Sequence, residues 1–315
     1  MSSKIAHVAT PAKAKQGRAL PVYAAVVLGF MVLVILEGAL VRATGSGAGC
    51  GNHWPLCNGD FFPHHPRLAT IIEYTHRSMT GICTALVAIL IGWTFLARER
   101  GDRARRAVIW SGILLITEAL LGALLVKGGY VENNASDMRV LMQCIHFTNT
   151  MLLLAAITLS WWWLRDRAQP INLPPQAHTA AWLALGATIV VGGTGSVAAL
   201  ADTLFPPTSL QAALLQDIAA HSPMLVRMRW VHPVAALIGL GCAIWLALQL
   251  SSTLGRLVLA LISVQLILGA TNVLLLAPTW MQVVHLLGAD LYWIALVAAC
   301  ATVIAPRPLN FTEAS

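Results

Sequence analysis

The sequence predicts an all-α integral membrane protein whose eight transmembrane helices form two pseudo-symmetric four-helix bundles. Its 315 residues are 57% hydrophobic and only 10% charged, whereas soluble domains carry about 25% charged residues. Eight apolar runs are each long enough to cross a ~30 Å hydrocarbon core as a helix. These runs lack the period-two alternation of barrel strands.

The runs that we expect to cross the membrane share a length of about 20 residues or more. The first run has no small-residue cleavage site after a short apolar core, so we interpret it as a retained helix and not as a removed signal peptide. The predicted spans are 21–42, 70–97, 107–127, 137–164, 178–200, 224–250, 255–276 and 280–304.

The net charge of +7 does not indicate nucleic-acid binding, because the basic residues concentrate in the tails and in every second loop and do not gather on one face. By the positive-inside rule, this alternation between more basic and less basic loops places both termini in the cytoplasm, with tails at 1–20 and 305–315. The basic residues that set it are Lys4, Lys13, Lys15, Arg18, Arg98, Arg100, Arg103, Arg105, Arg106, Arg165, Arg167, Arg256 and Arg307.

The two groups of four spans resemble each other, which predicts an internal duplication. "LVRATGSG" in the first span is similar to "VVGGTGSV" in the fifth, and "TEALLGALLV" in the third is similar to "VQLILGATNV" in the seventh. The second comparison pairs Glu118 with Gln265. A polar, Pro-rich linker at 165–177 separates an N-terminal bundle (21–164) from a C-terminal bundle (178–304).

Four histidines lie inside predicted spans, one on each even-numbered span: His76, His146, His232 and His285. Each follows its predicted helix start by roughly 5 to 9 residues, or about 8 to 14 Å, so all four occupy the outer half of the membrane. One such histidine is usually explained by a hydrogen bond to a neighbouring helix. Four at matched depth favour function, because ionisable residues are costly in a membrane.

Histidines from facing helices can supply two neutral imidazoles to one iron porphyrin, so two pairs predict two heme sites. Zinc is less favoured, since it takes three or four closely grouped ligands. The sequence contains no CxxCH motif, and any heme would therefore be held without thioether bonds.

Six segments occur in consistent order from about residue 37 to 297: "EGALVRATGSGAGCGNHWPLCNG", "IEYTHR", "LVKGGYVENNASDMRVLMQCIHFTNT", "ALADTLFP", "RWVHP" and "HLLGADLYWIAL". Together they resemble the heme A synthase family. Members of that family are membrane oxidoreductases that convert heme O to heme A for cytochrome oxidase. They oxidise the C8 methyl group of heme O to a formyl group by successive hydroxylations.

The resemblance implies a role for each histidine pair. His76 and His146 would be ligands of the substrate heme in the N-terminal bundle, and His232 and His285 would be iron ligands of a heme b cofactor in the C-terminal bundle. Heme O would be the substrate and heme A the product. The implied partners are heme O synthase and cytochrome oxidase assembly factors in a bacterial inner membrane, with no nucleic acid. The electron-transfer partner is not identified, and homo-oligomerisation is left open.

Glu73 and His76 are three residues apart and share a helix face. Beside an iron site, the Glu73 carboxylate could orient an imidazole, accept protons, or hold the species that attacks the substrate. Members of the family carry this glutamate, which implies a catalytic role. The alternative is that Glu73 only pairs with Arg77 at the membrane edge.

Four arginines are candidates for contact with heme propionates, which guanidinium groups bind bidentately. The alternative for those near outer helix ends is snorkelling to the interface. The candidates are Arg42, Arg77, Arg139 and Arg229.

Cys50 and Cys57 flank "GNHWPL" in the first outer loop, where glycine and proline favour a tight turn. The outside of a bacterial inner membrane permits disulfides, so we predict a bond between them. Two free thiols are the alternative. The third outer loop, residues 201–223, has no cysteine, whereas some family members carry a second pair there.

Two other functions are compatible with this pattern. A di-heme, quinol-linked b-type electron carrier would hold two hemes that stay chemically unchanged. A transporter would use the repeat as two moving halves and the histidines as a proton path.

Overall fold

The computed structural model describes residues 18–165, 173–250 and 252–305. In these ranges every extended regular element is a helix, and eight stretches are long and apolar enough to cross a membrane, which confirms the predicted fold class. The helices of the described ranges are α1 (Ala19–Ala43), α2 (Leu68–Ala97), α3 (Arg103–Lys127), α4 (Asp137–Leu164), α5 (Gln176–Leu204), α6 (Leu210–Ile218), α7 (Met224–Arg227), α8 (Val231–Gln249), α9 (Thr253–Leu274) and α10 (Thr279–Ile304).

The observed helix boundaries lie close to the predicted ones. The predicted span 137–164 coincides with α4, and the ends of the other spans differ by at most four residues. Most of the predicted tails and of the linker falls outside the described residues. The basic residues Lys4, Lys13, Lys15, Arg167 and Arg307 also lie outside them.

The sixth span differs from the prediction because it is not one continuous helix. It consists of α7 and α8, and residues 228–230 interrupt it. Pro233 then lies in the first turn of α8, where its missing N–H leaves no hydrogen bond unmade. In an unbroken helix from residue 224, the same proline would remove an internal hydrogen bond and crowd the preceding turn.

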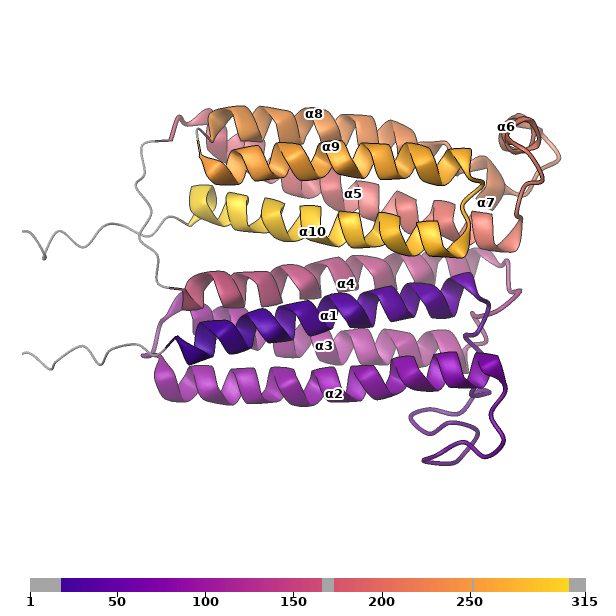
Figure 1. Cartoon of the computed structure of the whole chain (residues 1–315), viewed down its shortest axis with the longest axis horizontal. Helices are drawn as coiled ribbons and strands as arrows, with labels where there is room; N and C mark the ends of the chain where they lie inside the picture. The colour runs from indigo at the N-terminus through magenta and orange to yellow at the C-terminus, as the bar shows by residue number, and fades with distance from the viewer. Residues whose placement is uncertain (1–17, 166–172, 251, 306–315) are drawn as a thin grey trace, which may run out of the picture.

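The long helices lie in two groups of four (Figure 1). One group contains α1, α2, α3 and α4, and the other contains α5, α8, α9 and α10. The groups meet where α1 and α4 contact α5 and α10. One buried cluster includes both Leu154 of α4 and Leu296 of α10, so the hydrophobic core continues from one group into the other. The most apolar stretch of α10 is 67% buried, against 11% for α9, which makes α10 the central helix of the second group.

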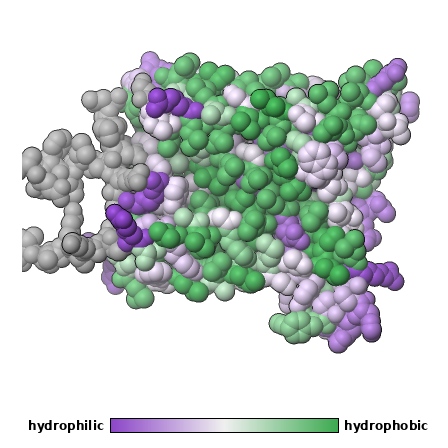
Figure 2. All heavy atoms as spheres, in the orientation of Figure 1, coloured by the Kyte–Doolittle hydropathy of each residue, from purple (hydrophilic) through white to green (hydrophobic). Residues whose placement is uncertain are grey.

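The surface of the molecule is suited to a lipid environment. Hydrophobic residues cover the middle of the visible face, and hydrophilic residues gather toward the two ends of the helices (Figure 2). Large apolar side chains such as Leu96 of α2 and Leu237 of α8 are 90% and 63% exposed. Helices satisfy their own backbone hydrogen bonds, which is what a lipid-facing segment requires. The chain is a multi-pass membrane protein.

Candidate functional site

Each of the two predicted substrate-heme histidines packs against a glycine of the preceding helix. A Cβ atom built on Gly38 of α1 would lie 3.0 Å from Cε1 of His76 on α2. A Cβ atom built on Gly122 of α3 would lie 3.8 Å from Cε1 of His146 on α4. The Nδ1 atoms of both histidines are buried and have no hydrogen-bond partner among the described residues.

The second group of helices repeats this arrangement. A Cβ atom on Gly195 of α5 would lie 2.9 Å from Cε1 of His232 on α8, and one on Gly269 of α9 would lie 3.1 Å from Cε1 of His285 on α10. The rings of His232 and His285 face each other, with centroids 6.4 Å apart and planes inclined at 80°.

The spacing of His232 and His285 fits a shared iron. Two metal–nitrogen bonds of ~2 Å, extended by the distance from each nitrogen to its ring centre, place the centroids of two axial imidazoles roughly 6 Å apart. The glycines let the imidazoles approach the neighbouring backbone. The residues present therefore fit a bis-histidine heme group at His232 and His285, and His76 and His146 repeat the same glycine-packed arrangement.

Carboxylate and amide side chains lie beside two of these imidazoles. Glu118 Oε1 is 3.6 Å from His146 Nδ1, and Asn149 Nδ2 donates to Glu118 Oε2 at 2.6 Å. Thr150 Oγ1 also donates to the Glu118 carboxylate. In the second group, the Gln265 amide nitrogen lies 3.2 Å from His285 Nδ1 and 3.4 Å from His285 Nε2. Polar neighbours of this kind restrict the orientation of an imidazole.

The internal repeat in the sequence had paired Glu118 with Gln265 without naming either as a site residue. The structure places Glu118 beside His146 and Gln265 beside His285. His232 lacks a side-chain neighbour of this kind, and its Nδ1 instead lies 3.2 Å from the backbone oxygen of Val191.

The structure corrects the register of the other repeat. The sequence comparison aligned Gly45 with Gly195, but the glycine that packs on a histidine in the first group is Gly38. Gly45 lies beyond the end of α1 with φ +65°, where it helps to terminate the helix, whereas Gly195 lies inside α5. The shared "TGS" letters therefore occupy different structural positions.

Glu73 is buried, and both of its carboxylate oxygens have partners. Oε1 accepts from Arg77 Nη2 at 2.5 Å and from Arg77 Nε at 3.1 Å, and Oε2 accepts from the backbone N–H of Cys50 at 2.7 Å. The predicted alternative, pairing with Arg77, is therefore present. Glu73 also joins α2 to the first outer loop.

The loop between α1 and α2, which the sequence predicts to lie outside, is closed by the predicted Cys50–Cys57 disulfide. Arg77 Nη1 donates to the backbone oxygens of His53 (2.7 Å) and Leu56 (3.0 Å), which lie between the two cysteines. Thr70 Oγ1 donates to Gly49 O at 2.7 Å. The loop is thus fastened over the outer end of α2. The free cysteines of the described residues are Cys83, Cys144, Cys242 and Cys300.

The other candidate arginines also have protein partners. Arg42 donates from Nη1 to Ala199 O (2.7 Å) and Thr203 Oγ1 (2.6 Å) of α5, and from Nη2 to Gln282 Oε1 (2.8 Å) of α10. Arg42 therefore links the two groups of helices near the C-terminal end of α1.

Arg139 and Arg229 are likewise engaged with neighbouring segments. Arg139 donates from Nη1 to the backbone oxygens of Glu132 and Asn134. Arg229 forms ion pairs with Asp202 (3.1 Å) and Asp217 (2.9 Å), which secures α6 to the rest of the fold. A propionate at any of these arginines would have to join or displace an existing partner.

Comparisons with known proteins agree with this architecture. Residues 21–297 match the family model COX15-CtaA, described as cytochrome oxidase assembly protein. A Thermus thermophilus protein named protoheme IX farnesyltransferase is 40% identical over 286 residues, which are 87% of this chain and 47% of that protein.

Two shorter matches are to proteins named heme A synthase. The one from Alkalihalophilus pseudofirmus is 36% identical over 140 residues, 44% of each chain. The one from Bacillus pumilus is 42% identical over 132 residues, 41% of this chain and 39% of that protein. The chain spans about half the length, or less, of these curated relatives.

The family model extends over both glycine-packed histidine pairs and over the disulfide loop, and the names of two relatives are those of the family that the sequence motifs resemble. The chain belongs to the COX15-CtaA family of cytochrome oxidase assembly proteins.

Proposed function

We propose that this protein is a heme A synthase, which oxidises the C8 methyl group of heme O to a formyl group by successive hydroxylations. The observation that carries the proposal is a duplicated histidine pair whose two copies differ in their polar neighbours. The carboxylate of Glu118 lies beside His146, and the neutral amide of Gln265 lies beside His285. Membership of the COX15-CtaA family supports an activity in heme A formation.

The two halves have different tasks in this proposal. His76 and His146 hold heme O in the N-terminal half, and His232 and His285 hold a resident heme b in the C-terminal half. The heme b group supplies one-electron redox chemistry when bound. Gln265 and the backbone oxygen of Val191 fix the orientation of its two imidazole ligands.

The carboxylates of the N-terminal half serve the reaction itself. Glu118 orients His146 and, with Asn149 and Thr150 as donors, keeps its charge stabilised inside the membrane. Glu73 is the proposed catalytic proton acceptor on α2, on the same face as His76. Its contact with Arg77 favours the charged carboxylate and holds it in place. Arg42, Arg77, Arg139 and Arg229 remain the candidates for propionate contact.

The proposed setting is a bacterial inner membrane, with both termini cytoplasmic and both heme sites toward the outer face. The histidines lie in the halves of their helices nearer the disulfide loop, whose bond is compatible with an oxidising outer side. Heme O synthase as supplier, and cytochrome oxidase assembly factors as recipients, follow from the proposed substrate and product.

The relative named for farnesyl transfer has to be weighed against this proposal. Only 47% of that protein aligns with 87% of this chain, so more than half of it has no counterpart here. The relatives named heme A synthase carry no mention of farnesyl transfer in their names. We therefore assign the oxidation, and not the farnesyl transfer, to the helices shared with this chain.

Pigment extraction tests the proposal. The full chain is produced in cells that also make heme O, purified in detergent, and its hemes are separated by chromatography. We expect heme b together with heme O or heme A. Heme b alone would support an electron carrier, and no heme absorbance would support a transporter. Formation of heme O from protoheme and farnesyl diphosphate by the purified chain would overturn the assignment of the oxidation.

A further inference from the structure

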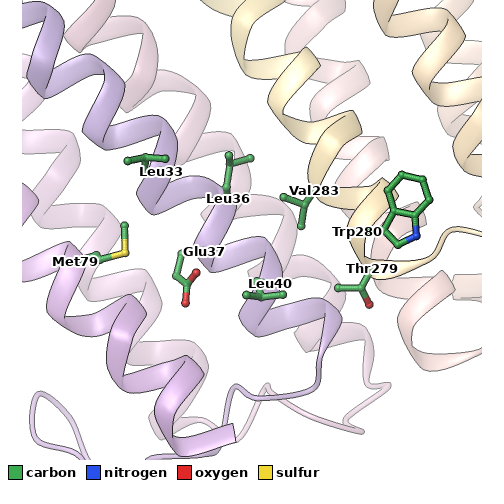
Figure 3. Close-up of a pocket in the computed structure, with 8 residues that line it drawn as sticks. All are labelled: Leu33, Leu36, Glu37, Leu40, Met79, Thr279, Trp280 and Val283. Atoms are coloured by element: carbon green, nitrogen blue, oxygen red, sulfur yellow. The ribbon is translucent and has the colours of Figure 1, made fainter. Parts of the chain in front are cut away.

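A hollow of about 610 Å³ lies between the two groups of helices and is not part of either histidine pair. Its volume falls in the ~300 to 1,000 Å³ range of small-molecule sites. Figure 3 shows its lining, which comes from α1, α2 and the start of α10. The lining residues are Leu33, Leu36, Glu37, Leu40, Met79, Thr279, Trp280 and Val283.

The hollow opens sideways to the lipid phase and is almost entirely apolar. Leu33 and Trp280 at its margin are 53% and 61% exposed, and they would face acyl chains in a bilayer. Leu33, Leu36, Glu37 and Leu40 are spaced so that they share one face of α1. A long hydrocarbon chain could therefore enter this hollow directly from the membrane.

Glu37 is the single carboxylate among these lining residues, and Figure 3 shows it between Met79 of α2 and Val283 of α10. No hydrogen bond or ion pair joins its side chain to any other residue in the described ranges. An unpaired ionisable group inside a membrane is costly and is a functional candidate by default. The corresponding position before Gly195 in the second group is Thr194, which bonds only to its own helix.

The hollow lies next to the proposed substrate site. Gly38, the residue after Glu37, is the glycine on which the imidazole of His76 packs. Met79 follows His76 by three residues and shares its face of α2. A molecule bound at His76 could thus extend a side arm past Glu37 into the hollow.

We propose that this hollow holds the farnesyl chain of heme O and that Glu37 accepts a hydrogen bond from the hydroxyl group at the root of that chain. The inference rests on the proposed function and adds a residue that determines specificity. Heme O differs from heme b by a hydroxyethylfarnesyl group in place of one vinyl group. That group combines a hydroxyl donor beside the ring with a long apolar chain, which matches one carboxylate at the edge of an apolar hollow.

This arrangement discriminates between hemes because the porphyrin of heme b offers neither feature. A heme b molecule at His76 would leave the Glu37 carboxylate unpaired and the hollow without its chain. Sites built to bond a substrate hydroxyl reject analogues that lack it, since the buried polar group of the site is then unsatisfied. Glu37 would therefore select the farnesylated substrate.

Titration of hemes into the purified full chain tests the proposal. Protein is produced in cells that lack heme O, and its affinities for added heme O and for added heme b are measured from the absorbance change. For Glu37→Leu we expect about tenfold weaker binding of heme O, the effect of losing one hydrogen bond to a charged group, and binding of heme b that is equal or tighter, because no carboxylate is left unpaired. Glu37→Gln keeps an acceptor and should lose less.

A second variant tests the hollow without touching the carboxylate. Leu40→Trp fills the space and should weaken the binding of heme O but not of heme b. Val26→Trp is the control, because Val26 is a 56% exposed residue of α1 outside the lining. The resident heme b spectrum reports whether each variant is folded.

Three outcomes would overturn the proposal: equal losses for both hemes, an unchanged heme O affinity in Glu37→Leu, or no effect of Leu40→Trp. The last outcome is expected if a membrane lipid or a quinone occupies the hollow. Failure of the proposed function looks different, since the unmodified protein would then bind heme O no better than heme b or would fail to convert it.

Discussion

At the scale of single residues, Glu73 has one role that the structure shows, anchoring a loop, and one role that we propose, proton transfer. Its carboxylate accepts from Arg77 and from the backbone N–H of Cys50, so it fastens the disulfide loop to α2. The same residue is the proposed catalytic proton acceptor near His76. Anchoring requires an acceptor of the right shape, whereas proton transfer requires a group that titrates. The two roles can therefore be separated by substitution.

Replacing Glu73 with glutamine should greatly reduce heme A formation. General acid–base groups contribute about 10²- to 10⁴-fold to a rate, and glutamine cannot accept the proton. The heme b spectrum should stay intact, because His232 and His285 are untouched. The measurement is the ratio of heme A to heme b in extracted pigment.

Arg77→Gln is the matched variant, since it breaks the same ion pair but leaves the carboxylate. We expect it to lose less activity than Glu73→Gln. A normal rate in Glu73→Gln would mean that Glu73 acts only as an anchor of the loop.

Among the helices, four consecutive pairs of spans share the same glycine–histidine contact. An odd-numbered span supplies a glycine and the following span supplies a histidine whose ring lies against it. Small residues allow such close approach between membrane helices. The fit is tightest where a Cβ atom would come within about 3 Å of the imidazole, and looser at Gly122, where the distance would be 3.8 Å. The four glycines are therefore not equivalent.

The loss of heme caused by replacing each glycine with alanine should depend on the distance between the added Cβ atom and the imidazole. Gly195→Ala and Gly269→Ala should lower the heme b content, and Gly38→Ala should lower the binding of heme O, because a methyl group displaces the imidazole at a cost of about 1–3 kcal/mol. Gly122→Ala is the control and should keep its heme, because 3.8 Å is an ordinary contact. Heme per protein after purification is the readout, and loss of heme in Gly122→Ala alone would contradict this account.

The Cys50–Cys57 disulfide should matter more for the loop than for the fold. Replacing both cysteines with serine removes a constraint on a short loop, worth up to about 3 kcal/mol locally. Helix packing carries most of the stability, so the heme b spectrum should persist. Amide hydrogen exchange across residues 50–57 should quicken, and heme A formation should fall because Glu73 loses a fixed partner at Cys50. An unchanged exchange rate in this segment would show that Arg77 and Thr70 hold the loop without the disulfide.

At the scale of the whole molecule, Arg42 joins the two groups of helices. It extends from α1 to the backbone and side chain of α5 and to Gln282 of α10. α10 is the most buried of the long helices and contacts α1, α4, α5 and α9. The two groups of helices are thus held in a fixed relation by the contacts of Arg42 and through the core.

All loops on one side of the membrane should report the same compartment in reporter fusions. Reporter fusions at residues 102, 170 and 310 should give cytoplasmic signals, and fusions at 58, 133 and 210 should give external ones, because the basic residues favour the side of the termini. A cytoplasmic signal at 58 would place the disulfide loop and all four histidines at the wrong face.

The amino-acid sequence alone was enough to predict the number and extent of the membrane spans, the four histidines within them and the disulfide. These features depend on local hydropathy, on ligand type and on neighbours close in the chain. The contact of Glu73 with Arg77 also belongs here, since residues four apart on a helix are adjacent.

The packing of the helices was needed to show which glycine meets which histidine and that Gly38, not Gly45, is the counterpart of Gly195. It was also needed to show that Arg42 bonds to α5 and α10. Lipid is as apolar as the core of a helix bundle, so inward and outward faces of a membrane helix carry similar residues. On α2, Leu90 is fully buried and Leu96 is 90% exposed, although the two side chains are identical. Hydropathy cannot indicate the rotation of such a helix, and the contacts that form the site depend on that rotation.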